Sequence, residues 1–185
     1  MSTIMSTQSA EEQLLQDMMT RYCKDLYSVY PDMKKLREVL TQLSDEQKLH
    51  ILQQEYYGWR TPLHCAASRD HTEIISTLLT SLQSSADRLK PLMVDEWTPL
   101  YEAAGRGHTD SVKMILDCLT PDQQIQIMSL QNYVGETAIQ WAETSGYTDT
   151  ERILREYQHR AHNLMKEEYS KSMMIIIPLL LIILS

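Results

Sequence analysis

Three stretches of the chain repeat one pattern of residues, and this repetition decides the fold. Residues 61–73 read TPLHCAASRDHTE, residues 98–110 read TPLYEAAGRGHTD, and residues 137–149 read TAIQWAETSGYTD. The threonines that open them, Thr61, Thr98 and Thr137, are 37 and 39 residues apart. Self-similarity at a fixed period of about 20–50 residues is typical of proteins that stack one structural unit several times. We therefore expect a repeat architecture.

Each position of the pattern suits a pair of helices joined by a tight turn. The opening threonine can cap the first helix, and Pro62 and Pro99 suit its first helical position. The alanines that follow give this helix a narrow apolar face. Asp70, Gly107 and Gly146 stand where it should end in the left-handed conformation, which glycine adopts easily and aspartate tolerates. A second helix should begin two residues later, at Thr72, Thr109 and Thr148.

The pattern resembles the ankyrin repeat, a turn followed by two antiparallel helices, whose signature is Thr-Pro-Leu-His-x-Ala-Ala. Residues 61–67 match the complete signature, and the resemblance covers residues 55–158. The third copy departs from it at Ala138, Ile139 and Gln140. The resemblance implies an all-α solenoid of antiparallel helix pairs. It also implies that the ring of His64 bonds to the backbone of the adjacent turn.

The copies are spaced more widely than the family period of about 33 residues, so each unit holds extra residues after its second helix. Ser44 with Gln47, and Thr120 with Gln123, have the spacing of a capping box, and residues 84–89 are a weaker version. We therefore expect one short extra helix per unit, near residues 45–53, 85–92 and 121–129. A long irregular loop is the alternative.

The segments that flank the repeats should also be helical. Ser9 and Glu12 have capping-box spacing at the start of a helix that Pro31 should stop, and residues 33–43 carry an apolar face. Together they predict a degenerate unit that covers one end of the stack. The expected organisation is a disordered N-terminus at 1–9, a capping unit at 10–54, repeats with a long C-terminal helix at 55–170, and a hydrophobic tail at 171–185.

The charge and the cysteines exclude several classes of protein. The chain has 17 Lys+Arg against 25 Asp+Glu and a formal net charge of -8. It has no basic block to neutralise nucleic-acid phosphates, so we expect no nucleic-acid partner. Residues 1–10 have neither the basic nor the apolar region of a signal peptide. We expect the three cysteines to be reduced thiols in a cytoplasmic protein.

The last 13 residues differ from the rest, because 11 of them are large and apolar and none is charged. A membrane span needs about 20 apolar residues, so this segment is short, and Pro178 should kink it. Three interpretations stay open. The tail could anchor the protein on an intracellular membrane or insert shallowly into it. It could pack in a groove of this or another protein, or it could be a truncated or misjoined end.

No group of residues indicates catalysis, so an enzyme is the minority hypothesis. The five glycines form no phosphate-binding loop, and adjacent helical residues such as His64 and Cys65 do not face each other. His159 and His162 could share a helix face, which is a weak signal for a metal site. We expect no catalytic residue, no cofactor and no metal ion.

The main functional hypothesis is a non-catalytic adaptor that binds a protein. The ankyrin resemblance implies binding through the turn tips and the exposed first helices, and Tyr, Trp and Arg are enriched at binding hot spots. The expected partner-binding residues are Tyr57, Trp59, Arg69, Trp97, Glu102, Arg106, Tyr133 and Trp141. Trp59 and Trp97 could instead pack on the neighbouring turn as structure. The alternative function is a membrane-attached adaptor that residues 173–184 localise.

Overall fold

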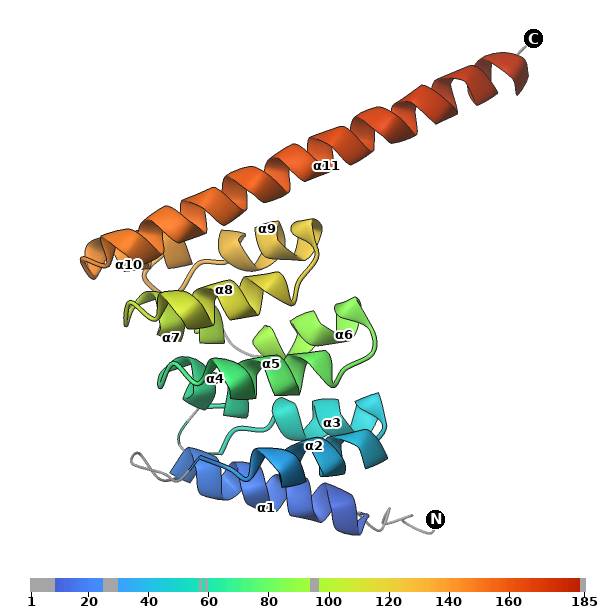
Figure 1. Ribbon diagram of the computed structural model, residues 1–185. Helices are drawn as coiled ribbons and strands as arrows, with labels where there is room; N and C mark the ends of the chain where they lie inside the picture. The colour runs from blue at the N-terminus through green and yellow to red at the C-terminus, as the bar shows by residue number, and fades with distance from the viewer. Residues whose placement is uncertain (1–8, 25–29, 57, 59, 94–96, 184–185) are drawn as a thin grey trace, which may run out of the picture.

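The chain folds into a stack of helices, with no strand among the described residues. The computed structural model describes residues 9–24, 30–56, 58, 60–93 and 97–183. Figure 1 shows the units following one another from α1 at one end of the stack to α11 at the other. The all-α repeat solenoid expected from the sequence is confirmed.

The helices recur in three layers. The first layer holds α1 (Ala10–Lys24), α4 (Pro62–Ala67), α7 (Pro99–Ala104) and α10 (Ala138–Thr144). The second layer holds α2 (Met33–Gln42), α5 (Thr72–Thr80), α8 (Thr109–Asp117) and α11 (Thr148–Ile183). The third layer holds α3 (Asp45–Leu52), α6 (Ser85–Leu89) with the 3₁₀ turn η1 (Lys90–Leu92), and α9 (Pro121–Ser129). Successive first-layer helices pack on one another from α1 to α10, and α8 packs between α5 and α11.

The third layer confirms that the extra residues of each unit are helical. The Ser44 side chain accepts from the backbone amide of Gln47, whose side chain accepts in turn from the amide of Ser44. Thr120 and Gln123 form the same reciprocal pair at the start of α9. Ser84 accepts from the Asp87 amide alone, so α6 has only half of a capping box. The shortest of the three helices thus has the weakest cap.

The left-handed residues also lie where the sequence predicts them. The φ angles are 57° at Asp70, 73° at Gly107 and 81° at Gly146. Asp70 offsets its backbone strain with a contact that glycine cannot make, because its Oδ1 accepts from the amide and the hydroxyl of Ser111 at 3.1 and 2.6 Å. Ser111 lies in the first turn of α8, where amides lack intrahelical partners. Asp70 therefore links the first repeat to the second.

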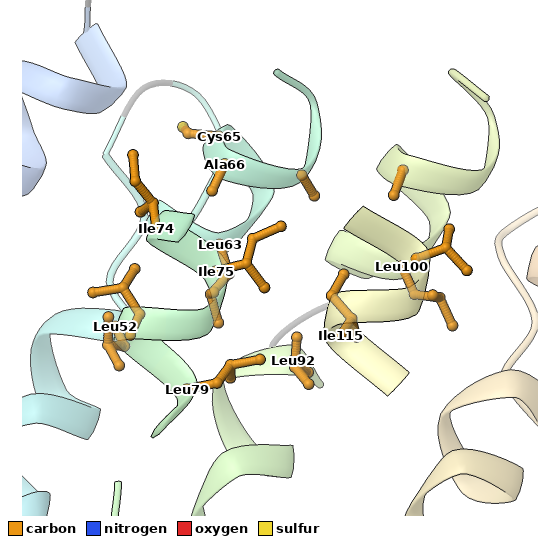
Figure 2. Close-up of a cluster of buried hydrophobic side chains, with 14 of the residues drawn as sticks. Leu52, Leu63, Cys65, Ala66, Ile74, Ile75, Leu79, Leu92, Leu100 and Ile115 are labelled. Carbon is orange, nitrogen blue, oxygen red and sulfur yellow. The ribbon is translucent and has the colours of Figure 1, made fainter. Parts of the chain in front are cut away.

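The core runs continuously between the layers. Leu63, Leu100 and Ile139 occupy equivalent positions in the three copies, and their side chains are 0%, 0% and 4% exposed. Figure 2 shows Leu92 of η1 in the same cluster as Leu63, Leu100 and Ile115. Each unit therefore buries its apolar residues against its neighbours, as expected of a repeat stack.

Different helices cover the two ends of the stack. At the N-terminal end α1 packs on α2, α3 and α4, with Leu15 and Met19 fully buried, so α1 takes the place of a first-layer helix. The disorder expected at 1–9 falls almost entirely on residues 1–8, which lie outside the described residues. The helix expected to run from Ser9 to Pro31 is described only as far as Lys24, because residues 25–29 also lie outside the described residues.

At the other end α11 crosses the last unit, packs on α8, α9 and α10, and projects beyond the stack (Figure 1). The expectation that this helix ends near Ser170 is wrong, since it continues to Ile183. Residues 171–177 contain no helix breaker, and Pro178 does not end the helix. None of the helices in the described ranges combines the length and the hydrophobicity that a membrane crossing requires.

Candidate functional site

Four aromatic side chains meet where the turn tips and first helices of the second and third repeats adjoin. We call Trp97, Tyr101, Tyr133 and Trp141 the aromatic cluster. The Trp97 ring stacks on the rings of Tyr101 and Tyr133, with centroid distances of 5.9 Å and interplanar angles of 28° and 27°. Trp141 meets Trp97 edge-on at 5.3 Å and 78°. Each such pair contributes about 0.5–1.5 kcal/mol beyond area burial, which fixes the rings relative to one another.

Glycines in the second repeat make room for aromatic rings from the third. A Cβ atom on Gly105 would lie 1.9 Å from Nε1 of Trp141, and a Cβ atom on Gly107 would lie 2.4 Å from the Tyr147 ring. The residues equivalent to Gly105 in the other copies are Ser68 and Thr144. The Trp141 indole can therefore take its position only because the second copy has a glycine where the other two copies have a side chain.

Two side chains at the same motif position tie the first helices to the next turn. His64 accepts at Nδ1 from the Thr61 amide and hydroxyl, at 3.3 and 2.8 Å, and donates from Nε2 to the carbonyl of Trp97. The role expected for His64 is thus confirmed. Tyr101 donates its hydroxyl to the carbonyls of Leu130 and Glu136 at 2.5 and 2.6 Å. Burial raises the pKa of Tyr101 to about 12, so this donor stays protonated.

A buried carboxylate lies beside the aromatic cluster. Glu102 pairs with Arg60 at 3.3 Å and with Arg106 at 3.0 Å, and we call these three residues the Arg60–Glu102–Arg106 clasp. The sequence places Glu102 among the exposed first-helix positions, but this is wrong, because Glu102 is only 4% exposed. The two arginines cover it, and a charge removed from water requires such partners.

The clasp and the aromatic cluster border one hollow. Its volume is about 410 Å³, and Tyr147, Gly105 and most of the cluster contribute to its walls together with the clasp. Tyr133 lies beside the hollow against Trp97 and is 77% exposed. The exposed ring of Tyr133 and the partly exposed rings of Trp97 and Trp141 therefore lie near the guanidinium groups that Glu102 holds.

The structure brings together five of the eight residues expected to bind a partner, namely Trp97, Glu102, Arg106, Tyr133 and Trp141. Arg69 lies elsewhere, since its guanidinium covers the Tyr22 ring at 4.9 Å and donates to the Tyr22 carbonyl. Tyr57 and Trp59 lie outside the described residues. Sequence reasoning missed Tyr101 and Tyr147, although Tyr101 could have been found because it occupies the motif position of His64.

The histidine pair of the C-terminal helix bonds to neighbouring groups of the same helix. His162 bonds through Nδ1 to the Gln158 carbonyl at 2.7 Å, and His159 contacts the side chain of Asn163. Within the described ranges, no group of three or more His, Cys, Asp or Glu side chains could hold a metal ion.

Comparisons with known proteins agree with this fold. A family model described as "Ankyrin repeats (3 copies)" matches residues 32–127, just over half of the chain. No sequence among the curated proteins matches that of this chain. A chain in the crystal structure of the yeast ribosomal protein Rps3 in complex with its chaperone Yar1 has a similar fold, with a TM-score of 0.52 and 24% identity over 79% of this chain and 91% of that chain. The present chain belongs to the ankyrin-repeat family, whose members are generally non-catalytic interaction modules.

Proposed function

We propose that this protein is a non-catalytic adaptor that binds a protein partner through the aromatic cluster and the Arg60–Glu102–Arg106 clasp. The observation that carries this proposal is the exposed aromatic surface around Trp97, which the stacked rings and the ion pairs of buried Glu102 hold in place. Trp, Tyr and Arg supply much of the binding energy at protein interfaces. A surface already fixed before binding also loses less conformational entropy on association.

The exposure of the third-repeat turn supports the same conclusion. Tyr133 is 77% exposed and its neighbour Val134 is 61% exposed, although both lie at the tip of an otherwise ordered turn. Asn132 orders this turn, because its side-chain oxygen accepts from the amides of Val134 and Glu136, each at 3.0 Å. Contiguous apolar surface of this kind marks interaction sites more often than isolated exposed residues do. The yeast complex of Rps3 and Yar1 supports a protein partner in general terms only, because the sequence identity is 24%.

Capture of partners with matched variants tests the proposal. The full-length protein would be immobilised as wild type, as Tyr133→Ala/Arg106→Gln, and as the control Lys34→Gln/Gln126→Ala, whose positions are exposed and lie away from the hollow. We expect wild type and control to retain the same proteins, and the Tyr133/Arg106 variant to lose them while its circular dichroism spectrum stays unchanged. If the folded Tyr133/Arg106 variant captures the same proteins in the same amounts, the proposed site is wrong.

The second candidate function is attachment to a membrane through residues 173–184. It is favoured by apolar side chains on the projecting part of α11, where Met174 is 72% exposed and Ile176 is 46% exposed. Such a helix could insert shallowly at a bilayer interface. Flotation with phosphatidylcholine vesicles would compare the full chain with Met174→Lys/Ile176→Lys. We expect only the wild type to float, and a wild-type protein that stays with the aqueous fraction would eliminate this alternative.

A further inference from the structure

We propose that the hollow binds a proline-rich segment of the partner in the extended polyproline II conformation. This inference rests on the proposed function and names the chemistry of the segment that occupies the site. Three features support it: the donors that line the hollow, the type of backbone that could satisfy them, and the arrangement of the rings.

The side chains that line the hollow offer hydrogen-bond donors and no open carboxylate. The indole N–H of Trp141, which lies over Gly105, and the hydroxyl of Tyr147 make no hydrogen bond within the described part of the chain. The described residues that line the hollow include one carboxylate, that of Glu102, and its two oxygens are already paired, one with each arginine of the clasp. An indole N–H can only donate, and a phenol hydroxyl can donate as well as accept. The occupant should therefore bring acceptors.

The backbone of the occupant decides whether these donors find acceptors. The carbonyls of an α-helix are engaged within the helix, and no described residue of this protein forms a strand whose edge could pair with an extended β-segment. A polyproline II helix has no internal hydrogen bonds, so its carbonyls remain available. Each proline also removes a backbone N–H that would itself need an acceptor. A proline-rich segment thus matches a surface whose side chains donate.

The rings of the hollow suit the proline side chain. Trp97 and Trp141 meet at 78° with their centroids 5.3 Å apart, so the two indoles form a corner rather than one flat surface. A pyrrolidine ring is rigid and apolar, and it can lie on one indole while its edge contacts the other. Tyr133 extends the aromatic surface beyond the hollow, because it stacks on Trp97 and is 77% exposed. Aromatic-lined grooves bind proline-rich segments in other domains, where the preformed conformation lowers the entropic cost of binding.

Selection from a displayed library of random 12-residue peptides tests the inference. The full-length protein is the bait, and the enriched peptides are then synthesised with blocked ends as probes for titration. We expect the enriched peptides to share prolines at a fixed spacing. Replacing these prolines by alanine should weaken binding about tenfold, as for the truncation of an interface hot spot.

Variants of the protein test the two donors. Trp141→Phe and Tyr147→Phe each keep a ring but remove a donor, so each should weaken binding of the enriched peptides about fivefold, the equivalent of one hydrogen bond. Tyr169→Phe is the matched control, because that side chain is 69% exposed and lies away from the hollow, and it should bind like wild type. Circular dichroism would verify that all three variants are folded.

The outcomes separate this inference from the proposed function. Enriched peptides that lack proline overturn the inference, and they leave the site in place if Tyr133→Ala/Arg106→Gln abolishes their binding. The absence of any enriched motif, or unchanged affinity in both phenylalanine variants of the hollow, also overturns it. Proline-rich peptides whose binding responds to no substitution in the hollow or at Tyr133 count against the proposed site itself.

Discussion

Two junctions, one between the first and second repeats and one between the second and third, use different side chains to hold a first helix to the turn that follows it. His64 donates to one carbonyl of the following turn and also caps its own helix through Thr61. Tyr101 stands at the same motif position, but it donates to two carbonyls, those of Leu130 and Glu136. Its own helix is capped by Thr98, which accepts from the Tyr101 amide at 3.4 Å.

This difference shows that two different side chains can form the tether at this position. The imidazole of His64 is fully buried. The Tyr101 ring reaches the next turn and also stacks on Trp97, so it belongs to the tether and to the aromatic cluster. The proposed binding surface is therefore separate from the tether at the first junction and shares Tyr101 with it at the second.

The substitution with the largest expected effect, Leu100→Ala, should destabilise both junctions at once. Leu100 is fully buried in the repeat that the junctions share. Leu100→Ala should lower the free energy of unfolding by about 2–5 kcal/mol, since it removes buried methyl groups and leaves a cavity. Because a central repeat stabilises both neighbours, urea denaturation should show a single transition shifted to lower concentration. Gln126→Ala is the exposed control, and two separated transitions would contradict shared stabilisation.

The substitution with the next largest expected effect, His64→Leu, removes only the first tether. His64→Leu keeps a side chain of similar size but leaves the Trp97 carbonyl and the Thr61 amide without their partner. Each unsatisfied buried group costs about 1–3 kcal/mol, so we expect a loss of about 2–4 kcal/mol in urea denaturation. A loss below that of Tyr101→Phe would mean that the histidine tether is the weaker one.

A smaller effect is expected at the second tether. Tyr101→Phe removes the hydroxyl that two carbonyls share, but the ring can still stack on Trp97. We expect a loss of about 1–2 kcal/mol, because one buried donor disappears while packing is kept. Tyr169→Phe, at a side chain that is 69% exposed, is the matched control. A loss equal to that of the control would show that the hydroxyl contributes nothing to the junction.

The smallest effect concerns pH and the contact between α1 and the first repeat. His71 bonds through Nδ1 to the Tyr22 hydroxyl at 2.8 Å, and burial, together with Arg69, lowers the pKa of His71 below its ordinary 6.5. The unfolded chain therefore binds more protons there, so stability should fall as the pH drops through 6.5. The loss of stability between pH 7 and pH 5 should be smaller in His71→Gln. An equal loss in both proteins would place the titration elsewhere.

The local features of the fold could be predicted from the sequence because each depends on neighbouring residues. Caps such as Ser44 with Gln47, and left-handed turns such as Gly107, follow from residue types a few positions apart. The burial of Glu102 could not be predicted in this way, since it depends on Arg60 from the preceding turn. The length of α11 does not follow from the sequence pattern, because the change from a charged to an apolar composition near residue 171 does not coincide with a helix end.

The sequence indicates which types of residue form the candidate site, but it does not indicate which of these side chains contact one another. Trp97 and Trp141 were expected on the same face, but their edge-on contact depends on the absence of a side chain at Gly105. Arg69 matches the motif position of Arg106 and was expected to act likewise. It is engaged with Tyr22 instead, because α1 occupies the neighbouring place in the stack. Equivalent positions thus differ in use according to which unit adjoins them.

Asp70 has a consequence for engineering this stack. Its carboxylate reaches Ser111 of the following unit, whereas the residue at its position in the second copy is Gly107, which leaves room for Tyr147. Exchanging the order of the two copies would set the Asp70 side chain against the tyrosine ring and deprive Ser111 of its acceptor. The units of this protein are therefore not interchangeable modules, and a recombined version would need its junction residues moved together with its helices.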